Sequence, residues 1–74
     1  MASDPRYKIS VVIATYDRPE RLRECLDSLT RSVLPRALFQ VVVIDDGSPQ
    51  PSVEVTRSFE SELNIRCIRQ ENLG

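Results

Sequence analysis

The 74-residue chain has no histidine and contains only two glycines and two cysteines. Gly47 and Gly74, the only glycines, stand too far apart for a GxGxxG or Walker A phosphate loop, which excludes a dinucleotide dehydrogenase and a P-loop nucleotidase. Without histidine, and with no serine or cysteine in an elbow motif, triad catalysis has no support. A structural zinc site made of thiols and imidazoles alone is excluded, because two cysteines and no histidine cannot supply four ligands.

The two cysteines show no metal-binding or redox spacing. Cys25 falls on the apolar stripe of an expected helix, and Cys67 falls inside an expected strand. We therefore expect both to be buried free thiols.

Long apolar runs and blocks of basic residues are also missing. No run approaches the roughly 20 apolar residues of a membrane-spanning helix, and the first residues show no signal-peptide core. Ten lysines and arginines against eleven acidic residues give a net charge of -1, so nucleic acid is not expected as a partner. We expect a soluble, cytoplasmic protein that would associate with a membrane only through regions outside this chain.

The residues that are present predict the order β-α-β-α-β. Apolar, β-branched runs predict strands at 8–14, 39–44 and 65–69, the first two without polar alternation, as in strands covered on both faces. Helical spacing of apolar residues predicts helices at about 18–32 and 51–63. The apolar stripes consist of Leu22, Cys25, Leu26, Leu29 and Val33 in the first helix and of Val55, Phe59 and Leu63 in the second.

The handedness of parallel crossovers bears on how much of a domain is present. Two successive right-handed crossovers in one direction place both helices on the same face of the sheet. The second face would then need another layer. We expect an α/β fold with a three-layer, Rossmann-like parallel sheet, of which this chain holds only the first β-α-β-α-β half. Residues 1–7 would be a leader, and residues 8–74 the incomplete domain.

Polar residues follow the first two predicted strands. Thr15, Tyr16 and Asp17 end the first strand, and Asp45 and Asp46 end the second. Ligands of open α/β sheets bind beyond the carboxyl ends of the strands, so the two groups would share one rim. A tyrosine ring can stack on a nucleobase, and a carboxylate can accept a hydrogen bond from a ring N–H such as that of uracil.

Simpler roles are open for each of these residues. Asp17 could be the N-cap of the first helix and form a capping box with Glu20. Asp45 or Asp46 could accept backbone hydrogen bonds in an Asx-type turn, and Tyr16 could be ordinary packing. The acid pair could also hold Mg²⁺, although neighbouring side chains after a strand often point apart.

Several segments together resemble a known family. Residues 10–19, the apolar stripe of the first helix, residues 42–48 and residues 69–74 resemble the amino-terminal part of a family 2 glycosyltransferase of GT-A fold. The resemblance covers residues 8–74. It implies a transferase that passes a sugar from a nucleotide-diphospho-sugar (UDP-, GDP- or dTDP-) to an acceptor hydroxyl, with this half binding the nucleotide.

The resemblance also implies roles by position. Tyr16 would stack on the base, Asp46 would accept its hydrogen bond, and Thr15 and Asp17 would line the pocket. Asp45 is the alternative base contact. Asn72 and Gly74 would approach the nucleotide. The sequence departs from the family at Ala14, where proline or a hydroxyl residue is usual, and at Asp17, where asparagine is commoner.

The resemblance places other parts of such an enzyme outside this chain. The ligands for Mg²⁺ or Mn²⁺ and the catalytic base of the family lie later in its sequence, so we expect no catalytic and no metal-binding residue here. The chain alone should not transfer sugar. The rival hypothesis is a non-catalytic α/β module that binds a nucleotide or a protein partner. A phospho-acceptor receiver domain is disfavoured, because its acid pair would follow the first strand.

Overall fold

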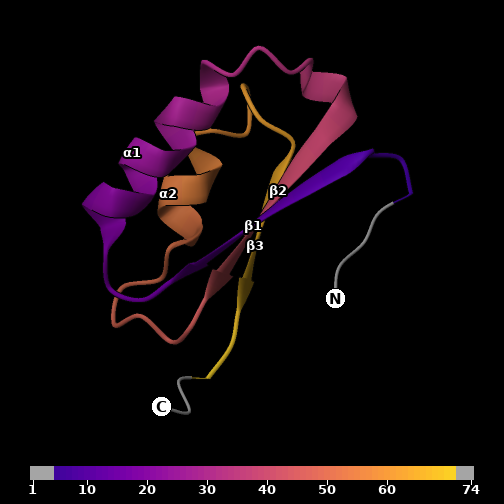
Figure 1. Cartoon of the computed structure of the whole chain (residues 1–74). Coiled ribbons are helices and arrows are strands. Elements are labelled where there is room, and N and C mark those ends of the chain that lie inside the picture. Colours follow the sequence, from indigo (N-terminus) through magenta and orange to yellow (C-terminus); the bar gives the residue numbers. More distant parts are fainter. Residues whose placement is uncertain (1–4, 72–74) are drawn as a thin grey trace.

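Three parallel strands form the centre of the protein (Figure 1). The computed structural model describes residues 5–71. Strands β1 (Ile9–Thr15), β2 (Phe39–Asp45) and β3 (Ile65–Arg69) lie side by side in the order β1-β2-β3. The predicted strands agree with these bounds to within one residue, and the predicted α/β class and β-α-β-α-β order are confirmed.

Two helices and a short 3-10 turn connect the strands. Helix α1 (Pro19–Thr30) joins β1 to the turn η1 (Arg36–Leu38), and α2 (Val53–Arg57) joins β2 to β3. Both helices lie on one face of the sheet, as the handedness of the crossovers predicted (Figure 1). No helix within residues 5–71 is long and apolar enough to cross a membrane.

The start of α1 differs from the prediction. Arg18, not Asp17, is the N-cap, and no side chain caps the helix, so the expected capping box with Glu20 is wrong. The reason is the backbone of Asp17, which has a φ of 49° and turns its N–H toward the hydroxyl of Ser48. The helix begins instead at Pro19, whose fixed φ suits the first helical position.

Helix α2 is much shorter than the predicted 51–63. Beyond Arg57 the chain continues in turns whose backbone hydrogen bonds mostly span three residues. The hydroxyls of Thr56 and Ser58 donate to the carbonyls of Val53 and Val55, at 2.9 and 2.6 Å. Side-chain bonds of this kind compete with the helical backbone, which explains the early end.

The core lies between the helices and the sheet, and it corrects two sequence expectations. Leu22 and Leu26 of α1 are buried as predicted. Val33, expected on the same stripe, lies beyond the helix and is 98% exposed. Cys25 is exposed at the side of α1, and Cys67 is half-buried, so the thiols are free but not both buried. Burial and the nearby negative charge of Asp45 raise the pKa of Cys67.

The second face of the sheet has no helix on it within residues 5–71 (Figure 1). We call it the open face. Val12 of β1 is 44% exposed there, and Ile68 of β3 is 39% exposed. Alternation along the strands assigns it Ser10, Val12, Ala14, Gln40, Val42, Ile44, Arg66 and Ile68.

Candidate functional site

The carboxyl ends of the three strands meet at one edge of the sheet. Thr15, Asp45 and Arg69 are level with one another in the strand register. The ladder continues one step further, because the N–H of Asp46 donates to the carbonyl of Thr15 and the N–H of Gln70 donates to that of Asp45, each at 2.9 Å. The backbone is therefore regular up to the residues that carry the polar side chains.

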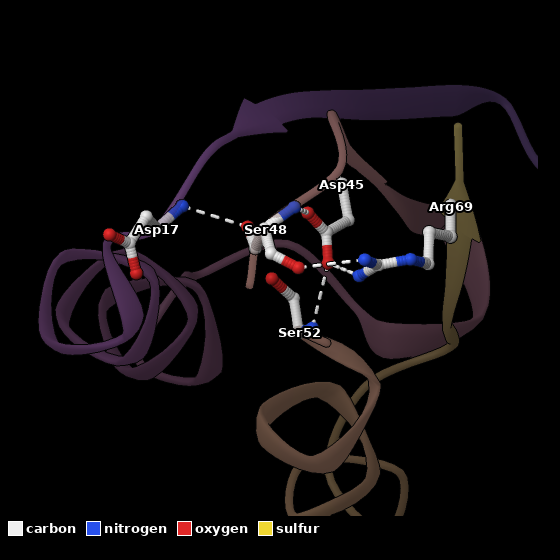
Figure 2. A network of polar contacts seen from close by, with 5 residues as sticks. All are labelled: Asp17, Asp45, Ser48, Ser52 and Arg69. Carbon is white, nitrogen blue, oxygen red and sulfur yellow. Dashed lines mark hydrogen bonds and ion pairs between the residues drawn. The ribbon is translucent and has the colours of Figure 1, made fainter. Parts of the chain in front are cut away.

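Asp45 turns toward the helical layer and is fully buried. Its Oδ1 accepts a hydrogen bond from the N–H of Ser48 at 2.9 Å, and its Oδ2 accepts one from the N–H of Ser52 at 2.8 Å (Figure 2). A guanidinium nitrogen of Arg69 lies 3.2 Å from Oδ2. This is the Asx-type arrangement that the sequence left open, and it leaves the carboxylate no exposed surface for a ligand.

The charge of Asp45 is stabilised by these donors. Burial on its own raises the pKa of the carboxyl, but the hydrogen bonds from Ser48 and Ser52 outweigh it and lower the pKa from 3.8 to about 2. Asp45 is therefore an ionised group that holds the loop after β2 against the sheet.

Asp46 has a different environment, as expected where successive residues of an extended chain face opposite ways. Asp46 helps to line a groove of about 540 Å³ that runs between β1 and α1. Thr15 and Tyr16 line the same groove, and the Tyr16 side chain is 45% exposed. Gln70 donates to Oδ1 of Asp46 at 3.2 Å.

Two arginines also line this groove. Arg18 and Arg21, one turn apart at the start of α1, stand beside an apolar lining that includes Ile13 and Leu22. The groove thus combines an aromatic ring, a carboxylate and two guanidinium groups. Guanidinium groups suit phosphate oxygens.

The other predicted site residues lie elsewhere. Asp17 borders a separate groove between the first turns of α1 and α2, and its carboxylate points away from Ser48 and Asp45 (Figure 2). Asn72 and Gly74 fall outside the residues that the structure describes. The structure therefore brings together Thr15, Tyr16 and Asp46, and leaves Asp17 and Asp45 out of their groove. Nucleotide binding by any of these residues stays a prediction.

Sequence reasoning gave no role to Arg18, Arg21, Arg69 or Gln70. Arg21 falls off the apolar stripe of its helix, and helical periodicity does not show that the groove beside β1 reaches it. Arg69 ends the third strand and Gln70 follows it, as Asp45 ends the second strand and Asp46 follows it. Applied to that strand, the strand-end rule would have pointed to both.

The residues present do not fit a metal ion. Within residues 5–71, no group of three histidine, cysteine, aspartate or glutamate side chains could hold one. Of the two adjacent acids, Asp45 already accepts three donors. The described residues therefore do not form a metal site at this edge of the sheet.

A parallel sheet with polar side chains gathered at its carboxyl edge is typical of ligand-binding α/β proteins. Residues 10–74 match the sequence profile of Glycosyl transferase family 2, and the chain belongs to this family. The predicted family and its Rossmann-like fold are thereby confirmed.

Named relatives agree with the family. The chain is 44% identical, over 66 residues, to validoxylamine A glucosyltransferase of Streptomyces hygroscopicus subsp. jinggangensis. It is 39% identical over 66 residues to chondroitin synthase of Escherichia coli. It is 31% identical over 64 residues to the poly(ribitol-phosphate) beta-N-acetylglucosaminyltransferase TarS of Staphylococcus aureus. These matches cover 86–89% of this chain but only 10–16% of the relatives' own lengths.

Proposed function

We propose that this chain is the nucleotide-binding part of a glycosyltransferase that passes a sugar from a nucleotide-diphospho-sugar to an acceptor hydroxyl. The observation that carries the proposal is the shared groove of Tyr16 and Asp46 at the ends of β1 and β2. Membership of family 2 and relatives named as sugar transferases support it.

Each side chain of the groove suits one part of a nucleotide. The half-exposed ring of Tyr16 can stack on the base. Asp46 can accept a hydrogen bond from a ring N–H through the oxygen that Gln70 does not contact. Uracil, thymine and guanine carry such an N–H, whereas cytosine and adenine do not, so UDP-, dTDP- and GDP-sugars are the favoured donors. Arg18 and Arg21 can pair with the diphosphate.

Sugar transfer would need further groups. We propose that Mg²⁺ or Mn²⁺, with ligands outside this chain, supplies the positive charge that a departing diphosphate requires. The base that activates the acceptor would also lie outside it. The acceptor is not specified by any described residue. A cytoplasmic location stays a prediction.

Calorimetric titration of the full-length protein with UDP, GDP and dTDP, with Mg²⁺ present, tests the proposal. We expect saturable binding of at least one of the three and weaker binding of CDP and ADP, which carry the same diphosphate but no ring N–H on the base. A folded protein that binds none of these nucleotides would contradict the proposed function.

A second candidate function is that of a module that binds a protein partner. The observation in its favour is the open face, where Val12 and Ile68 are exposed. Size-exclusion chromatography and circular dichroism of the 74 residues distinguish the two. A folded module that binds no nucleotide and elutes with a partner would support this second function.

A further inference from the structure

We propose that Arg69 is a positioning residue for the nucleotide base: it braces the end of β2 so that Asp46 faces the groove. The inference rests on the proposed function, because it concerns how the base acceptor is held. Arg69 does not line the groove itself and acts through the residues that it contacts.

The guanidinium group of Arg69 holds two parts of one loop. One nitrogen donates to Oδ2 of Asp45 at 3.2 Å, and the other donates to the carbonyl of Ser48 at 2.7 Å (Figure 2). The planar fork of an arginine can make both bonds at once, whereas the point charge of a lysine is less suited to that geometry. The segment 45–48 is therefore fixed from the end of β3.

Ser48 links this loop to the end of β1 through a hydrogen bond. Its side chain is buried, and its hydroxyl oxygen accepts a hydrogen bond from the N–H of Asp17 at 2.7 Å. Asp17 is the residue directly after Tyr16. Arg69, Ser48 and the backbone of Asp17 thus link the ends of all three strands, on the helical side of the sheet (Figure 2).

The two members of the acid pair have different partners from the end of β3. Arg69 contacts Asp45, and the next residue, Gln70, contacts Asp46. Removal of the guanidinium would take away one of the three donors to Asp45 and the bond to the carbonyl of Ser48, so the end of β3 would no longer hold the segment 45–48. Asp46 lies in this segment and would move with it.

Base discrimination is the measurement that separates positioning from general damage. The affinity ratio of UDP to N3-methyl-UDP reports the hydrogen bond to the ring N–H; if guanine is the preferred base, GDP and N1-methyl-GDP replace them. We expect the wild-type protein to prefer the unmethylated nucleotide by about tenfold or more. Asp46→Ala should abolish the preference, and Arg69→Gln should reduce it several-fold. Arg69→Lys should restore part of it.

Control variants separate this effect from loss of stability. Val55→Ala weakens the core beneath α2, away from the groove, and should leave the preference intact. Adding Arg69→Gln to Asp46→Ala should change the ratio no further, because both act on the same contact. If Arg69→Gln does not fold, Arg69→Lys serves in its place: it keeps a positive charge beside Asp45 but cannot make both bonds of the guanidinium at once, and should lower the ratio below that of the wild type.

The outcomes separate this inference from the proposed function. A wild-type protein that binds no nucleotide overturns both. Full discrimination in folded Arg69→Gln, or in folded Arg69→Lys where the first variant does not fold, overturns the positioning role alone. A several-fold drop in the ratio, with Val55→Ala unchanged, supports it.

Discussion

Asp45 and Asp46 are chemically identical neighbours with separate tasks. Asp45 is buried, ionised and engaged by two backbone N–H groups and a guanidinium. Asp46 lies along a groove with only one side-chain donor on its carboxylate among the described contacts. The first stabilises the fold, and the second is the proposed contact to the base.

The low pKa of Asp45 makes stability depend on pH. Its folded-state pKa of about 2 lies below the ordinary 3.8, so its stabilisation is complete above about pH 4 and is lost as the pH falls toward 2. The contribution at neutral pH is about 2 kcal/mol. Urea unfolding at a series of pH values should show this loss in the wild-type protein and a flatter profile in Asp45→Asn.

The matched control for that experiment is Asp46→Asn, which leaves the buried carboxylate untouched. Its acid profile should follow the wild type. An Asp45→Asn profile as steep as that of the wild type would mean that other carboxyl groups cause the acid sensitivity.

The two exposed acids of the rim should also differ in binding. Asp46→Ala should weaken nucleotide binding by about tenfold or more, because a hydrogen bond to a charged acceptor is lost. Asp17→Ala should have a smaller effect, since the Asp17 carboxylate borders another groove and only its N–H joins the Ser48 network. Calorimetry with UDP at a temperature where both variants are folded compares them. Equal, negligible effects would favour purely structural roles for both residues.

At the level of elements, strands were predictable and helix ends were not. Runs of β-branched residues locate β1, β2 and β3 almost to the residue, since few other structures suit them. In the predicted helix 51–63, the spacing of Val55, Phe59 and Leu63 correctly placed these residues toward the core. It could not show that the second half would be a series of turns, because both conformations bury the same positions.

Side-chain competition at the end of α2 can be tested by mutation. Ser58→Ala removes the hydroxyl that donates to the carbonyl of Val55 and replaces serine by the best helix former. We expect the helix to extend past Arg57, with a gain of up to about 0.5 kcal/mol in stability. Far-ultraviolet circular dichroism and backbone chemical shifts measure the extension. Ser61→Ala, in the exposed turn beyond, should change neither.

The location of the candidate site at the carboxyl ends of the strands was predictable from the sequence. The direction in which each side chain points was not. The strand-end rule found Tyr16 and Asp46, but it could not separate Asp46 from Asp45, because the direction of each side chain depends on the strand face. It also missed the left-handed backbone of Asp17, although aspartate and asparagine are among the residues that adopt it. That conformation gives a physical reason for the asparagine usual in the family.

At the level of the whole molecule, the two faces of the sheet are unequal. The right-handedness of the crossover connections predicted that both helices would lie on one face of the sheet, and they do (Figure 1). The apolar residues of the open face are in keeping with a further layer. The chain spans only 10–16% of the lengths of the three relatives described above.

The inequality of the faces predicts a difference between two valines. In the 74-residue chain, Val12→Thr should change the free energy of unfolding by less than about 0.5 kcal/mol, because the residue is on the open face. Val41→Thr, in the fully buried core, should cost about 1–3 kcal/mol. Urea unfolding at two protein concentrations measures both. A concentration-dependent cost at Val12 would show instead that a second copy covers this face.

The register of β3 gives the buried carboxylate a role during folding. Side chains alternate with a period of two, so a slip of one residue in either direction would move Arg69 to the open face of the sheet and place Ile68 or Gln70 level with Asp45. The slipped sheet would enclose the carboxylate of Asp45 without its counter-ion and would place the guanidinium of Arg69 on the opposite face. Only the observed register of β3 therefore pairs Asp45 with Arg69. The ion pair that forms in the native sheet also disfavours registers shifted by one residue.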